Sequence, residues 1–256
     1  MTSGRATLLI APVALGVVML VAWQVAVDVF DIPVYFVPAP RGILAQLGDQ
    51  HASVWAATRV TGWNALRGLV VGAVLGVVGA LVGNTISIVK EMAAPLVVAV
   101  SVMPIVALGP VLYGLFGGMF NTARVLVAAI AVAVPVYVNT LRGLQQVLPV
   151  HRDLMAAYDA SGWQRARAVT LPTGLPHLFT GLRIGSSLAV ISALITEYFG
   201  GPGDGLGLAI RNSASSGRIA LAWAYVVGSI VLGLVFYLAT YAAERWFGRH
   251  QMSRQR

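Results

Sequence analysis

Cysteine is absent from the 256 residues, and charged side chains make up only 10% of them. The lack of cysteine excludes disulfide scaffolds, zinc–thiolate sites, iron–sulfur clusters and thiol nucleophiles. With only four histidines as well, we expect no metal site. Soluble domains are about 25% charged and 45–50% apolar, whereas this chain is 58% apolar. The composition therefore predicts one membrane-embedded unit and not a soluble enzyme.

Catalytic patterns are also missing. No Gly-x-x-x-x-Gly-Lys-Ser/Thr segment occurs, so the chain has no phosphate-binding loop and we expect it not to hydrolyse ATP. Its apolar runs contain no paired acids or histidine clusters, and we predict no catalytic residue. The net charge of +8 fits basic loops on the cytoplasmic side of a bilayer, so we expect no nucleic-acid partner.

Stretches free of charge locate the membrane spans, each of which needs about 20 apolar residues. Six are predicted, at about residues 6–29, 60–83, 92–116, 122–141, 178–199 and 219–245. The first is too long for the apolar part of a signal peptide, so we expect an uncleaved helix. The third is rich in proline and glycine. We expect residues 103–112 to face the protein interior, because broken backbone needs protein or a water-filled cavity; a kinked helix facing lipid is the alternative.

Lysine and arginine predict the orientation. With the N-terminus in the cytoplasm, about twice as many basic residues lie inside as outside, in agreement with the positive-inside rule. Both termini are then cytoplasmic. The segments at about residues 30–56, 117–122 and 200–218 face outward, and residues 142–177 form the longest cytoplasmic segment.

That cytoplasmic segment reads as two short helices, at residues 151–158 and 164–170, joined by a turn at Asp159. Aspartate favours turns and tolerates left-handed backbone angles. We expect Pro172 and Pro176 to end the second helix. Apolar residues on these helices predict either a docking surface or an amphipathic loop lying on lipid headgroups; they are Leu154, Met155, Ala156, Ala157 and Trp163.

The same segment resembles the EAA loop of ABC importer permeases, the membrane subunits of binding-protein-dependent uptake systems. The family pattern is Glu-Ala-Ala, three residues, Gly, nine residues, Ile, one residue and Leu-Pro. Here Leu171-Pro172 closes the pattern, and its Ile, Gly and Glu positions hold Val169, Asp159 and Asp153. The resemblance implies that these residues couple the chain to an ATPase: Asp153, Leu154, Met155, Ala156, Ala157, Asp159, Ala160, Ser161, Gly162, Arg165, Val169, Leu171 and Pro172.

Three further segments resemble the nitrate, sulfonate, taurine and thiamine-pyrimidine branch of that family. They are Phe-Val-Pro-Ala-Pro at 36–40, Met-Pro-Ile-Val-Ala-Leu-Gly-Pro at 103–110, and Thr-Glu-Tyr-Phe-Gly at 196–200 followed by Gly-Leu-Gly at 205–207. The resemblance covers about residues 5–248, with the motifs in the family's order.

Such a subunit would be an all-α membrane protein with about six transmembrane helices, the type I ABC importer permease fold and a cytoplasmic coupling helix-turn-helix. The resemblance implies a bacterial inner-membrane location, a second permease copy or paralogue, an extracellular solute-binding protein, and two ATPase subunits that hold ATP and Mg. The alternative is a self-sufficient secondary carrier or channel. Carriers often show two similar halves and paired interior charges, and neither is evident here.

The solute would be small and either organic or oxyanionic, and the apolar interior favours an organic one. Candidates for the translocation path or its gate are Met103, Pro104, Val106, Pro110, Tyr113, Glu197 and Tyr198. Glu197 stands at the outer end of the fifth span, where a buried carboxylate is costly unless it is hydrogen-bonded. It is either a gate residue that accepts bonds from amides of the following glycine-rich loop or an interfacial acid.

Overall fold

The computed structural model describes residues 3–116, 121–200 and 203–252, and within these ranges all regular structure is helical. In chain order the helices are α1 (Ser3–Val29), α2 (Pro40–Asp49), α3 (His51–Thr85), α4 (Ser87–Val102), α5 (Ile105–Phe116), α6 (Thr122–Gln145), α7 (Pro149–Ala157), α8 (Gly162–Arg165), the π-helical turn η1 (Ala166–Thr170), α9 (Leu171–Phe199), α10 (Leu206–Ser215) and α11 (Ile219–Met252).

Long apolar helices match the predicted spans. In the described ranges five helical segments are long and apolar enough to cross a membrane, and α4 with α5 makes a sixth if the two are taken together. These two helices meet at a bend of 97°, so the third predicted span is broken, as its prolines suggested. α3 begins at His51, earlier than predicted. The segments predicted to face outward around 30–56 and 200–218 each contain a short helix, α2 or α10, that the sequence did not indicate.

One prediction for residues 142–177 is wrong, because neither proline ends the second helix. Residues Gly162–Phe199 form one continuous helical segment. The π turn widens the helix directly before Pro172: the Leu171 amide donates to the Ala166 carbonyl, five residues back. The missing proline amide then falls where the hydrogen-bond register changes, and the Thr173 hydroxyl donates to the Val169 carbonyl at 2.8 Å.

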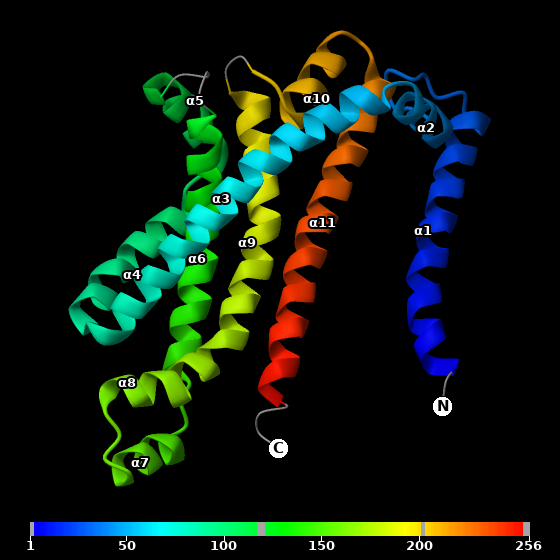
Figure 1. Cartoon of the computed structure of the whole chain (residues 1–256). Coiled ribbons are helices and arrows are strands. Elements are labelled where there is room, and N and C mark those ends of the chain that lie inside the picture. The colour runs from blue at the N-terminus through cyan, green and yellow to red at the C-terminus, as the bar shows by residue number, and fades with distance from the viewer. Residues whose placement is uncertain (1–2, 117–120, 201–202, 253–256) are drawn as a thin grey trace.

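Small residues allow α3, α6 and α9 to pack closely. Gly68, Gly72 and Gly76 lie four residues apart on α3 and face α6. A Cβ atom on Gly76 would lie 2.8 Å from the Ala133 carbonyl oxygen. Glycines at this spacing let membrane helices approach each other closely. The three helices thereby form the centre of the bundle (Figure 1).

The two ends of the bundle differ in what they carry. α7 and α8 lie at the same end as both chain termini, whereas α2, α5 and α10 lie at the opposite end (Figure 1). α8 lies across its end, while α9 runs along the bundle (Figure 1). We call these the α7–α8 end and the α10 end. α6 and α9 connect them directly.

Candidate functional site

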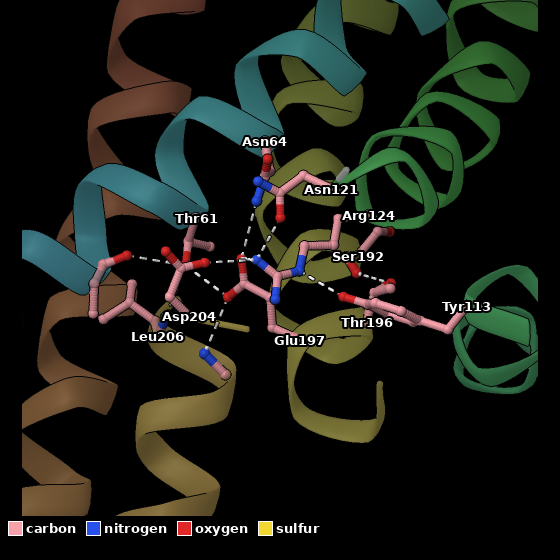
Figure 2. A network of polar contacts seen from close by, with 12 residues as sticks. Thr61, Asn64, Tyr113, Asn121, Arg124, Ser192, Thr196, Glu197, Asp204 and Leu206 are labelled. Carbon is pink, nitrogen blue, oxygen red and sulfur yellow. Dashed lines mark hydrogen bonds and ion pairs between the residues drawn. The ribbon is translucent and has the colours of Figure 1, made fainter. Parts of the chain in front are cut away.

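Glu197 lies in the last turn of α9 at the α10 end, and its side chain is fully buried. Its Oε2 atom accepts hydrogen bonds from the Thr61 hydroxyl at 2.7 Å and from the Gly207 amide at 3.2 Å. Its Oε1 atom accepts one from Asn64 Nδ2 at 3.5 Å. The bond from Gly207 is the loop-amide contact that the sequence predicted. Figure 2 shows donors from α3 and from the start of α10 converging on this carboxylate.

Arg124 brings the opposite charge from the first turn of α6, and its side chain is also fully buried. Its Nη1 atom lies 4.0 Å from Glu197 Oε1 and 3.2 Å from Asp204 Oδ1. Nη1 also donates to Asn121 at 2.9 Å, and Nε donates to the Tyr113 hydroxyl at 2.6 Å. A buried charge is costly unless paired and hydrogen-bonded, and here each charge has several partners.

The glycine-rich loop before α10 closes over this pair. Gly205 has φ +107°, and a Cβ atom there would lie 2.5 Å from the Glu197 carboxylate. An L side chain would therefore be excluded by backbone strain and by lack of space. The next amide, of Leu206, donates to the Thr61 hydroxyl at 2.8 Å, so α3 is bonded to both the loop and Glu197.

We call this group of residues the Arg124–Glu197 cluster; it contains Thr61, Asn64, Tyr113, Asn121, Arg124, Glu197 and Asp204. It links α3, α5, α6, α9 and the loop before α10 (Figure 2). Glu197 accepts hydrogen bonds from fixed donors, and Arg124 donates to fixed acceptors and lies near the Glu197 carboxylate. The cluster is therefore suited to hold the helix ends together. The described residues include no group of three or more His, Asp or Glu side chains positioned to hold a metal ion.

The predicted path residues do not form one site. Tyr113 belongs to the cluster, and the carbonyl of Tyr198 accepts a bond from Arg211 at 2.9 Å. Met103 and Pro104 lie at the α4–α5 break instead. Within residues 103–112 of this single chain, Gly109 is buried, whereas Val106 and Pro110 are exposed.

Sequence reasoning missed five members of the cluster: Thr61, Asn64, Asn121, Arg124 and Asp204. A signal was present for Arg124. It is the single charge between two long apolar runs, near the same predicted membrane surface as the lone acid Glu197. In the predicted topology Arg124 counts as one of the basic residues on the outer side. Two isolated opposite charges at equal depth are a pairing signal, because either alone is costly in a membrane.

At the α7–α8 end, the predicted helix-turn-helix is confirmed. α7 covers most of predicted residues 151–158, and Asp159 has the left-handed φ of +46° expected of the turn. Ser161 begins α8 with a capping box: its hydroxyl accepts from the Gln164 amide at 3.3 Å, and the Gln164 side chain accepts from the Ser161 amide at 2.7 Å.

Large apolar side chains on these helices are solvent-exposed. The exposed fractions of Leu154, Tyr158 and Trp163 are 48%, 76% and 68%. Met155 and Val169 are half-buried; together with Asn84 and Leu144 they line a crevice between these helices and the ends of α3 and α6. The two helices thus use one side to rest on the bundle and leave an apolar side uncovered.

Comparison with known proteins identifies the family of this chain. The family model for the binding-protein-dependent transport system inner membrane component matches residues 68–250. The chain belongs to this family. It is a permease subunit of an ABC import system, and it is a transport subunit and not an enzyme.

Relatives align along most of this permease. A probable ABC transporter permease protein from Haemophilus influenzae is 26% identical over 90% of this chain and 94% of its own length. The riboflavin transport system permease protein RibX from Chloroflexus aurantiacus is 27% identical over 94% of this chain and 90% of its own. The formylaminopyrimidine transport permease protein ThiX from Halalkalibacterium halodurans is 29% identical over 77% and 78%.

A solved structure supports the fold. The crystal structure titled as an amino acid ABC transporter with histidines superposes with a TM-score of 0.64, at 17% identity. It covers 78% of this permease and 96% of the solved chain. At this identity the likeness concerns the fold alone.

Proposed function

We propose that this permease forms the translocation path of its importer together with a second permease copy or paralogue, and that the α7–α8 end docks an ATPase subunit. Two ATPases, which bind ATP and Mg, then serve the pair. The observation that carries the proposal is the exposed apolar side of α7 and α8, with Leu154, Tyr158 and Trp163 at its centre. The charged residues Asp153 and Arg165 border it, as polar residues border protein interfaces.

The orientation follows from the same proposal. ATP is cytoplasmic, so the α7–α8 end and both termini, which share that end (Figure 1), face the cytoplasm of a bacterium. The α10 end then faces outward, where an extracellular binding protein delivers the solute. The largely exposed surfaces of α4 and α5 leave apolar area for the second permease.

A mechanism follows from the continuity of residues Gly162–Phe199. This helical segment carries Trp163 at the ATPase end and Glu197 in the cluster at the other end. ATPase closure would move α8, and α9 would transmit the movement to the Arg124–Glu197 cluster. We infer that the cluster acts as an outer gate, intact when the path is closed to the outside and loosened when it opens, in a rigid-body transition.

The solute is small and either organic or oxyanionic. Proteins similar to this permease are named for riboflavin, formylaminopyrimidine, aliphatic sulfonates, taurine and nitrate. These solutes share a small size, while their charge differs. The choice among them depends on the path and on the binding protein.

The docking proposal is tested by Ala157→Glu, since Ala157 is exposed at the end of α7. A carboxylate inserted into an apolar interface loses its hydration without gaining a partner. We expect ATP hydrolysis stimulated by loaded binding protein to fall at least about tenfold in the reconstituted complex, which corresponds to about 1.4 kcal/mol of coupling. The matched control is Ala157→Ser, which keeps the position small and uncharged.

Folding is checked by size-exclusion chromatography of the detergent-solubilised permease, where both variants should elute as the wild type does. Normal stimulated hydrolysis and uptake by Ala157→Glu would overturn the docking proposal. Uptake without any ATPase would instead favour a self-sufficient carrier.

A further inference from the structure

A cavity of about 410 Å³ lies where the α4–α5 break meets the middle of α6 and α9. We call it the α4–α5 cavity. Its volume is in the range of small-molecule sites, about 300–1,000 Å³. It is lined by Val100, Ser101, Met103, Ile105, Leu108, Ile130, Ala131, Val134, Pro135, Val138, Asn139 and Leu188.

No charged side chain is among these lining residues. Ser101 and Asn139 are the polar side chains in the lining. The Ser101 hydroxyl donates to the Val97 carbonyl at 2.7 Å, so its oxygen lone pairs remain as acceptors. Asn139 Nδ2 donates to the Pro135 carbonyl at 2.8 Å, which leaves Oδ1 as an acceptor.

One proline adds a backbone acceptor to the same wall. Pro135 lies inside α6 and has no amide to donate to the carbonyl four residues earlier, that of Ala131, which also lines the cavity. At the α4–α5 break the Val100 carbonyl accepts from the Met103 amide at 3.3 Å, so Pro104 frees no acceptor there. Within a membrane, a freed carbonyl is tolerated only next to protein or a water-filled cavity. Ala131 and the residues on either side of Pro104, Met103 and Ile105, border the same space.

The cavity is remote from the charges at the α10 end. Val134 is ten residues after Arg124 along α6, which is about 15 Å at 1.5 Å per residue. Arg124 and Glu197 are fully buried and 4.0 Å apart, and each has hydrogen-bond partners of its own, such as Tyr113 for Arg124 and Thr61 for Glu197. Neither charge is placed to neutralise a solute in the cavity.

We propose that the α4–α5 cavity is a resting site of the transported solute, and that this solute is uncharged, largely apolar and a donor of hydrogen bonds. This inference rests on the proposed translocation function. No lining residue is a cation, so an anion in the cavity would lose hydration without a charged partner in the wall, which is costly. A molecule with N–H or O–H groups instead meets the acceptors on Ser101, Ala131 and Asn139. Uncharged heterocycles fit this chemistry, and sulfonates and nitrate do not.

The absence of native cysteine makes a labelling test direct. Val134→Cys places one thiol on the cavity wall of the permease–ATPase complex in nanodiscs. The control is Ser216→Cys, which lies exposed between α10 and α11. The probes are uncharged methyl methanethiosulfonate and anionic sulfonatoethyl methanethiosulfonate, with labelling rates read by mass spectrometry.

Relative to the control, we expect the anionic reagent to label Val134→Cys at least about tenfold more slowly than the uncharged reagent. We also expect the rate with the uncharged reagent to change when ATP and vanadate trap the closed ATPase. Val138→Cys serves as a second wall position if Val134→Cys does not fold. Size-exclusion chromatography of the detergent-solubilised complex checks that each variant is intact, since a folded variant should elute as the wild type does.

Each other outcome overturns the inference in a distinct way. Equal rates for both reagents would show that the site accepts anions. No labelling by either would show that the cavity is closed to water, as when lipid chains fill it. A labelling rate that is the same with and without ATP and vanadate would show that the cavity is not part of the translocation path. ATPase docking is tested separately with Ala157→Glu, so the translocation proposal can survive any of these results.

Discussion

The two ends of the bundle differ in which side chains they bury and which they expose. At the α10 end, two opposite charges are fully buried and their partners come from α3, α5 and the loop before α10. At the α7–α8 end, apolar side chains such as Trp163 are exposed and the charged residues around them lie in solvent.

At the α10 end the polar groups are bonded within the chain, whereas at the α7–α8 end apolar surface is left for a partner protein to cover. Buried polar groups must be satisfied within the fold, because unmade hydrogen bonds are costly. Exposed apolar surface needs no hydrogen-bond partner within the fold. Its removal from water is favourable when a second protein covers it. We therefore expect substitutions at the α10 end to change stability and those at the α7–α8 end to change coupling.

The largest effect should come from Arg124→Met, which leaves Glu197 buried without its cation. Breaking a buried pair by removing one partner typically costs about 3–5 kcal/mol. We expect the free energy of unfolding in mixed micelles to fall by about this amount. Arg218→Met is the control, since Arg218 is exposed and surface changes usually stay within about 0.5 kcal/mol. Equal stability of the two variants would show that the cluster does not hold the α10 end together.

A smaller effect is expected for Glu197→Ala, because Arg124 keeps Asp204 as its anion and the Thr61 hydroxyl keeps the Ala57 carbonyl as an acceptor at 3.3 Å. The main loss is the acceptor of the Gly207 amide at 3.2 Å, which costs about 1–3 kcal/mol if the amide stays buried and unpaired. The loosened gate should raise basal ATP hydrolysis without binding protein and reduce uptake. Glu197→Gln keeps an acceptor and should cost less. If Glu197→Ala leaves both hydrolysis rates and uptake unchanged, the gate proposal fails.

At the other end, Asp159→Val tests the shape of the turn. A left-handed residue costs about 1–2 kcal/mol when the side chain is β-branched or bulky, and Asp159 has φ +46°. The variant should weaken stimulated ATP hydrolysis with little change in unfolding of the bundle. Asp159→Gly should retain hydrolysis, because glycine adopts this geometry freely. The reverse ranking would indicate that the carboxylate itself makes the contact.

The smallest effect is expected for Ser161→Ala, which removes the hydroxyl that caps α8. Loss of an N-cap costs about 0.5–2 kcal/mol locally, and the site is exposed. Stimulated hydrolysis should fall slightly, and Ser161→Asp, which can also cap, should restore it. An effect on global stability as large as that of Arg124→Met would contradict the division between the two ends.

The sequence alone determined the long apolar helices, the break in the third of them and the turn at Asp159 between two short helices. These features depend on local composition: charge-free runs of sufficient length, proline in the third run, and a residue that accepts left-handed geometry. The single buried acid at the end of the fifth span was also recognisable, because a carboxylate in such a run needs hydrogen bonds.

Only the tertiary structure decided which residues satisfy that acid. Arg124 and Thr61 reach Glu197 because glycines bring α3, α6 and α9 together, and this packing brings together residues far apart in the chain. The continuation of α8 into α9 through Pro172 depends on a π turn that proline content does not reveal. The α4–α5 cavity likewise forms only where residues of α4, α5, α6 and α9 pack around one space. The sequence of a segment shows which of its polar groups need a hydrogen-bond or charge partner when buried. The packing of the helices determines which residues become those partners.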